Sequence, residues 1–361
     1  MLRLETRRAP SAWMLYLTPF LAVILTMLAG LLLFAALGKD PIEAIRIIFF
    51  QPLTSASGLS ELVVKASPLI LIAIGLSIGF RAGVWNIGAE GQYTIGALTG
   101  GATALAVYPA EGFWLLPLMC FAGALGGAAW AAIPAFLRSR FGTSEILVSL
   151  MLVYVAILLL SVLVHGPLRD PDGFNFPESR LFQDSGKVPV LVAGKRAHIG
   201  FLVALAAVAG AWILLGKHIV GFQVKVLGQA PQAARFAGYS EKRLIWFCFI
   251  VSGALAGLAG LFEAAGPVGQ LVPALPSGYG FTAIIVAFLG RLTPIGILLA
   301  GFLMALTYIG GEQAQIAMSL PSATTSVFQG MLLFFLLASD VLVSYRVRLG
   351  RRGAAPVATR S

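Results

Sequence analysis

Charged residues are scarce in this sequence, and their scarcity excludes an ordinary soluble domain. Only 11% of the 361 residues are charged and 58% are hydrophobic, whereas soluble domains carry roughly 25% charged residues. Cysteine and histidine are scarce as well. Cys120 and Cys248 stand in apolar runs that suit packing rather than a disulfide or a ligand, and the three histidines have no metal-ligand spacing. We therefore predict a membrane protein with no metal and no cofactor of its own.

Common catalytic motifs are missing too. The sequence contains no G-x-x-x-x-G-K-[ST] phosphate loop, no H-E-x-x-H and no G-x-S-x-G elbow. The glycines of SGALAGLAG (252–260) have the G-x-x-x-G spacing that lets two helices in a membrane approach closely, so a nucleotide loop is the weaker interpretation. No catalytic residue is predicted, and the energy for work against a gradient would come from a partner or an ion.

Apolar windows of about 20 residues, long enough to cross a membrane as a helix, recur along the chain. They predict an all-α fold, a polytopic bundle of about ten spans in one transmembrane domain (1–345), followed by a basic tail (346–361). The first window follows three arginines, but its apolar run is too long for a signal peptide and we expect it to be retained. The windows are 12–37, 60–80, 90–108, 113–137, 144–165, 199–216, 243–263, 276–290, 294–310 and 322–343.

Lysine and arginine set the predicted orientation. With ten spans and the N-terminus inside, most of the cations fall on the cytoplasmic side. Both termini are therefore expected in the cytoplasm, and the net charge of +10 reflects topology rather than nucleic-acid binding.

Polar residues interrupt the apolar pattern at RAGVWNIGAEGQ (81–92), between the second and third windows. A polar or non-helical stretch at membrane depth survives only when it is buried in protein or lines water. A weak internal symmetry places a second Gly-rich break at 263–281, so that 60–165 and 243–343 could form an inverted repeat with interrupted helices near a solute path.

Two loops also attract interest. In the inside loop (217–243), the stretch from Gln229 to Ala237 is predicted to form a helix of about two turns, with Pro231 at its first position and Gly238 closing its end. The alternative is a solvated basic loop. The outside loop (166–198) has alternating charges and three phenylalanines, typical of either a structured cap for a docking partner or a solvated connector.

Several stretches resemble one family of transporters. VLGQAPQAARFAGYSEKR followed by FIVSGALAGLAG is similar to the coupling loop and next helix of bacterial ABC importer permeases of the branched-chain amino acid, monosaccharide and nucleoside superfamily. VWNIGAEGQ, GTSEILVSLML and PSGYGFTAIIVAFLGRLTPIGILLAG resemble elements of its simple-sugar and nucleoside branch. Ser144 and Val153 depart from that pattern, since both positions usually hold asparagine.

The resemblance implies a permease subunit in the bacterial inner membrane that is not itself an enzyme. A second permease subunit, identical or paralogous, would enclose the path, a separate ABC ATPase subunit would use ATP, and an extracytoplasmic solute-binding protein would deliver the solute. Nucleosides or related purine compounds are the first expectation and simple sugars the second. The expected ATPase contacts are Gln229, Ala233, Ala234, Arg235, Ala237 and Gly238.

The expected path or hinge residues are polar or aromatic. They are Trp85, Asn86, Glu90, Gln92, Ser144, Glu145, Tyr279 and Phe281. Their amides and carboxylates could bind a hydroxylated or heterocyclic solute and their rings could stack on it. In the alternative interpretation Asn86 and Glu90 only satisfy exposed backbone ends. An ion-coupled secondary transporter would also explain membrane carboxylates, but not a docking helix; an intramembrane enzyme would need a nucleophile and base that are missing.

Overall fold

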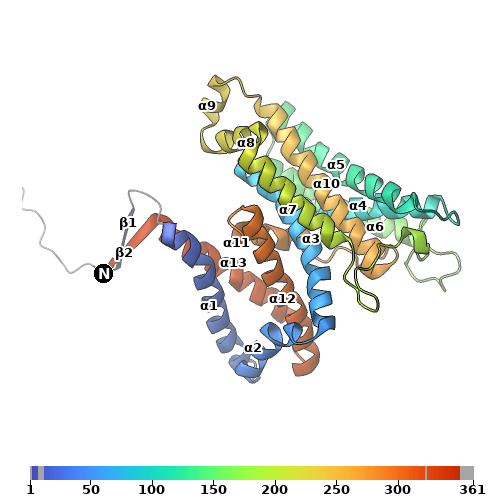
Figure 1. Ribbon diagram of the computed structural model, residues 1–361, viewed down its shortest axis with the longest axis horizontal. Coiled ribbons are helices and arrows are strands. Elements are labelled where there is room, and N and C mark those ends of the chain that lie inside the picture. Colours follow the sequence, from blue (N-terminus) through green and yellow to red (C-terminus); the bar gives the residue numbers. More distant parts are fainter. Residues whose placement is uncertain (1, 7–11, 322, 350–361) are drawn as a thin grey trace, which may run out of the picture. The chain divides into compact units, whose positions relative to one another are not determined.

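The computed structural model describes residues 2–6, 12–321 and 323–349, and most of them are helical (Figure 1). Each of the ten predicted spans coincides with a helix, which confirms the all-α prediction. A ribbon of two short antiparallel strands, β1 (Leu2–Thr6) and β2 (Tyr345–Leu349), is the exception. The ten helices are α1 (Ala12–Ala36), α3 (Ala56–Arg81), α4 (Ala89–Ala106), α5 (Leu115–Phe141), α6 (Glu145–His165), α7 (Gly200–Lys217), α10 (Glu241–Glu263), α11 (Tyr279–Leu289), α12 (Pro294–Met318) and α13 (Ala323–Ser344).

Among the described residues, seven helices are long and apolar enough to cross a membrane. Of the ten, α4, α11 and α13 fall outside this set, α13 because only its stretch Ser326–Ser339 is counted. α4 carries Glu90, Gln92 and several glycines, which lower its hydropathy. α11 has 11 residues and reaches only about 16 Å, about half of a hydrocarbon layer. The predicted spans α4 and α11 are therefore stable in a membrane only when other helices of the bundle surround them.

The chain divides into two compact units, residues 1–50 with 311–361, and residues 51–310. In the first unit α1 packs on α13, with Phe34 and Phe328 stacked at 6.4 Å between ring centroids. The same unit holds a helix without a predicted counterpart, α2 (Pro41–Phe49), whose first turn is capped by Asp40. The predicted single domain stays a prediction, and residues 350–361 of the predicted tail lie outside the described residues.

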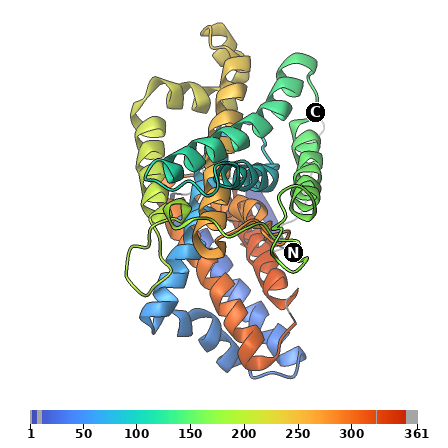
Figure 2. The same ribbon diagram turned by 90° about the vertical axis from the view of Figure 1, so that its right-hand side faces the viewer.

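Helix α10 is the centre of the second unit, where it packs against α3, α4 and α5 (Figure 2). The glycines of SGALAGLAG make these contacts backbone to backbone. A Cβ atom on Gly257 would overlap the carbonyl oxygen of Gly123 on α5, and one on Gly96 of α4 would overlap Gly257 itself. The close approach predicted from the glycine spacing is thereby confirmed.

One substitution tests this packing. Gly257→Val should lower the free energy of unfolding by about 3 kcal/mol or more, because the added atoms meet backbone that cannot rotate away. Gly210→Val on α7 is the matched control, since a Cβ there would have no described atom within 4 Å. Thermal unfolding in detergent should separate the two variants, and equal melting temperatures would contradict the packing.

Candidate functional site

The break between α3 and α4 (residues 82–88) lies deep in the second unit. The Asn86 amide donates to Ser252 Oγ at 3.0 Å, and Ser252 is the midpoint of α10. Asn86 is only 2% exposed. Asn86 of the polar stretch predicted from the sequence is therefore enclosed by helices, while Trp85 next to it is partly exposed.

Asn86 and Gln92 hold this break together as a reciprocal amide pair. Asn86 Nδ2 donates to Gln92 Oε1 at 2.8 Å, and Gln92 Nε2 donates back to Asn86 Oδ1 at 3.0 Å. The same Asn86 oxygen accepts the backbone N–H of Gly88 at 3.0 Å. Because partners within the chain occupy these amides, they favour the structural interpretation over direct solute binding.

Glu90 joins the first break to the second. Its carboxylate accepts the backbone N–H of Gly278 at 2.8 Å and that of Gly280. These groups open α11, where the first N–H groups of a helix have no intrahelical partner and carry partial positive charge. Gly278 takes a positive φ of 84°, a conformation that favours glycine. A side chain of α4 thus caps α11 and brings the two interrupted helices into contact, while the inverted repeat stays a prediction.

A largely buried cluster beside this cap includes a lysine that is not among the expected site residues. Lys65 of α3 donates to the Tyr279 hydroxyl at 2.8 Å and lies over the Tyr279 ring at 5.5 Å. The Glu263 carboxylate is also a hydrogen-bond partner of that hydroxyl, and the Tyr93 ring meets Tyr279 edge-on. The sequence did contain a signal for this role, because Lys65 lies inside the apolar window 60–80, where a charged side chain is costly unless it is paired.

The aromatic candidates separate into two groups. Tyr279 is 1% exposed and belongs to the core, whereas Trp85 and Phe281 are 39% and 38% exposed. Trp85 packs at a tilt against Phe80, with 5.1 Å between ring centroids, and stacks on Phe288 at 5.9 Å. Of the predicted path aromatics, only Trp85 and Phe281 present much of their surface outside the helix packing.

Ser144 and Glu145 lie at the start of α6, in a hollow of about 480 Å³. Glu145 pairs with Arg138 of α5 and accepts the Trp85 backbone N–H at 3.3 Å. Glu145 therefore ties α6 to the first break. Glu241 and Lys242 of α10 line the same hollow, next to the helices of the 217–243 loop.

The 217–243 loop forms two helices rather than one. α8 (Ile219–Gln229) was not predicted, while α9 (Pro231–Phe236) matches the predicted short helix. Pro231 stands at its first turn and Gly238 follows it with φ +77°, as expected. A structured pair of helices replaces the alternative of a solvated loop.

The expected ATPase contacts differ in exposure. Ala233, Ala237, Gly238 and Gln229 are exposed. Ala234 is fully buried inside the chain, and Arg235 forms an ion pair with Glu241 at 2.8 Å. Ala234 therefore has no surface to offer a partner, whereas the roles of the exposed residues remain predictions.

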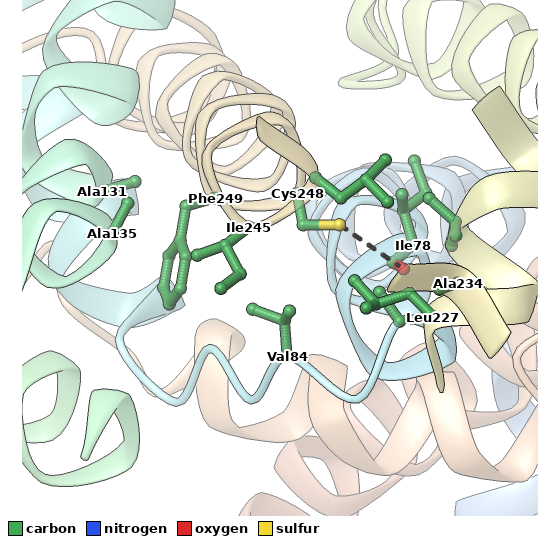
Figure 3. Packing of buried hydrophobic residues seen from close by; sticks show 12 residues of the cluster. Ile78, Val84, Ala131, Ala135, Leu227, Ala234, Ile245, Cys248 and Phe249 are labelled. Carbon is green, nitrogen blue, oxygen red and sulfur yellow. Dashed lines mark hydrogen bonds between the residues drawn. The ribbon is translucent and has the colours of Figure 1, made fainter. Parts of the chain in front are cut away.

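Ala234 belongs to a hydrophobic cluster that connects α9 to the first break (Figure 3). The cluster includes Val84 of the break and Cys248 of α10, whose thiol lies 3.9 Å from the Ile78 carbonyl oxygen. Behind it, a Cβ on Gly228 of α8 would overlap the Arg81 carbonyl oxygen. The α8–α9 pair is thus seated directly on the turn that follows α3.

The 166–198 loop is a structured cap at the opposite end of α10. It contains the 3-10 helix Asp184–Gly186, and Val188 donates its N–H to Ala265 at 2.9 Å. Ala265 lies in the π-helical turn Ala264–Val268 that follows α10. Phe182 is 2% exposed and anchors the cap, whereas Phe174 is 93% exposed. Docking of a partner here stays a prediction.

His198 closes this cap with a buried ring. It is 2% exposed, and burial together with the nearby Arg196 charge lowers the His198 pKa to about 4. Nδ1 accepts the Gly200 N–H at 3.2 Å, while Nε2 has no partner among the described residues. The ring is therefore neutral at ordinary pH and acts as a packing group. In the described part of the chain, His, Cys, Asp and Glu are not grouped in threes that could hold a metal.

Comparison with known proteins identifies the family. The family of permease components of branched-chain amino acid transport systems matches residues 58–337. The chain belongs to this family. It is similar to the glucose ABC transporter permease protein TsgB13 of Haloferax volcanii, with 40% identity over 98% of this chain and 95% of that protein.

Two further relatives carry another substrate class in their names. The guanosine ABC transporter permease protein NupP of Bacillus subtilis is 28% identical over 94% of this chain and 97% of that protein. The nucleoside ABC transporter permease protein NupB of Lactococcus lactis is 28% identical over 90% of this chain and 92% of that protein. This chain is accordingly a multi-pass membrane permease, as the sequence resemblance implied.

Glu90→Gln tests the cap of α11. Glutamine offers one acceptor oxygen where the carboxylate offers two, so one backbone N–H should lose its partner and the free energy of unfolding should fall by about 2 kcal/mol. Glu43→Gln on α2, where the side chain is 46% exposed, is the matched control. Melting temperatures in detergent provide the measurement. Unchanged stability with abolished uptake would instead place Glu90 in the solute path.

Proposed function

We propose that the chain is the membrane-spanning subunit of an ATP-driven importer that passes a small hydroxylated ring solute. The observation that carries this proposal is the meeting of two interrupted helices, α4 and α11, through Glu90 at the centre of the bundle. Helix breaks of this kind mark solute paths in transporters. Membership of a permease family supports the same function.

A simple sugar is the favoured solute. The glucose permease relative is 40% identical along almost the whole chain, a closer likeness than the 28% of the guanosine permease. Nucleosides, which come first in the sequence analysis, become the second candidate and are supported by two relatives. Both classes have a ring with an apolar face and several hydroxyls, so one path chemistry could serve either.

The partner proteins would dock at the two ends of the second unit. An ABC ATPase would dock on the exposed residues of α9, and its closure would move α8 and α9 against the turn after α3. A solute-binding protein would dock on the 166–198 cap, and a second permease would complete the path. In this arrangement the α9 end and both termini are cytoplasmic, in the inner membrane if the host is bacterial.

Uptake by whole cells tests the substrate. Cells in which the gene for this chain is deleted should lose uptake of labelled glucose, and restoring the gene should recover it. Labelled guanosine, assayed in the same cells, separates the two candidates. Loss of guanosine uptake with normal glucose uptake would reverse the order given above, and normal uptake of both would overturn the proposal.

Replacement of an exposed α9 residue tests coupling. Ala233→Arg should abolish solute-stimulated ATP hydrolysis by the assembled transporter, because a bulky charge would occupy the docking surface, while membrane insertion stays normal. Ala36→Arg, at an exposed position at the end of α1 and outside both proposed docking surfaces, is the matched control. Full ATP hydrolysis by the Ala233 variant would show that α9 does not dock the ATPase.

A further inference from the structure

Helix α11 begins inside the membrane thickness. Its first residue, Tyr279, contacts Lys65 of α3, and Lys65 lies nine residues after the start of α3 at Ala56, or about 13 Å along its axis. The 26 residues of α3 span about 39 Å. A hydrocarbon layer of about 30 Å centred on α3 would therefore place the Lys65 backbone about 9 Å inside the nearer surface of that layer. α11 therefore starts at a depth where lipid cannot provide hydrogen-bond partners for its first backbone N–H groups.

The chain that leads into α11 is irregular and partly exposed at this depth. It descends from Leu271, whose N–H binds Ser179 of the cap, and the side chains of Ala274 and Ser277 are exposed. Non-helical backbone in a membrane occurs only where it is buried in protein or lines water. The exposed side of this segment consequently faces a water-filled space or another protein surface.

Helix α11 presents an aromatic strip on its exposed face. Its buried face, with Ala283 and Val286, packs on α3 and α4. The opposite face runs from Phe281 to Phe288, two turns or about 10 Å apart. Phe288 stacks on Phe80 at 5.3 Å and on Trp85 at 5.9 Å between ring centroids. An aromatic surface thus continues from α11 onto the first break.

The depth of this strip changes along its length. Phe281 follows Tyr279, the first residue of α11, by two residues and lies deep in the layer. Trp85 packs against Phe80, the last residue but one of α3, so this end of the strip lies near the membrane interface, where tryptophan gathers. An exposed aromatic surface that begins next to an exposed irregular segment and ends at the interface fits a hydrated path.

We propose that Phe281, Phe288 and Trp85 form a stacking strip along the solute path, which rests on the function proposed above. A sugar ring or a nucleobase has an apolar face that stacks on aromatic rings. Its hydroxyl or amide groups at the rim remain free for water and for Ser277. Stacking of this kind depends little on the type of ring, so the strip can bind sugar rings and nucleobases alike. The solute-binding protein would then select the solute.

Cysteine accessibility tests whether the strip faces water. The assembled transporter, in membranes, carries Phe281→Cys in a background of Cys120→Ala and Cys248→Ala, and the probe is a charged, membrane-impermeant thiol reagent. Phe281→Cys should react, and saturating transported solute, glucose or guanosine, should slow the reaction severalfold. Ala283→Cys, on the buried face of the same helix, should stay unreactive.

Transport kinetics give a second readout. Phe281→Ala should raise the KM of uptake about three- to tenfold through lost stacking, and Phe281→Tyr should restore it. Phe121→Ala on α5, where the ring is 65% exposed, is the matched control and should leave KM unchanged.

Two results would overturn the strip: an unreactive Phe281→Cys, or a reaction rate that is unchanged by the solute which the wild type takes up. Failure of the substrate assignment looks different, because the wild type would then take up neither glucose nor guanosine while Phe281→Cys still reacts with the aqueous reagent.

Discussion

The second unit depends on one hydrogen-bonded cap, in which the Glu90 carboxylate of α4 binds the first backbone N–H groups of α11. A helix that starts inside a membrane leaves unpaired N–H groups in a medium that cannot solvate them. Glu90 supplies acceptors and negative charge at that point. Without it, α11 would have to start at the membrane surface, and its 11 residues are too few to cross the layer from there.

Other contacts of the unit keep this cap in place. The glycines of α10 bring α4 and α5 close enough for their backbones to touch, and the Asn86–Gln92 pair holds the chain between α3 and α4 in one conformation. Lys65 and Glu263 converge on Tyr279 just after the capped N–H groups. Most of these polar groups, each of which would be costly in a membrane, bind one another, although Glu263 Oε2 has no hydrogen-bond partner among the described residues.

The α8–α9 pair and the outer cap contact the same unit from opposite ends. Ala234 reaches Val84 and Cys248 through the buried cluster, and Arg81 donates to the Leu292 carbonyl oxygen at 2.9 Å, which links the end of α3 to the turn after α11. At the other end, Val188 holds the cap on the turn after α10. A displacement at either end therefore reaches both interrupted helices through short chains of packed residues.

Apolar windows and glycine spacing were sufficient to predict the ten helices, the close packing of α10 and the short helix after Pro231, because these features depend on local periodicity and residue size. The partner of Glu90 is 188 residues away along the chain, and Lys65 meets Tyr279 across 214 residues. No local pattern encodes such pairs. The tertiary structure decided which residues of each pair are buried, because burial depends on which helices pack together. Ala234 is buried while Ala233 is exposed, and Tyr279 lies in the core while Phe281 is accessible.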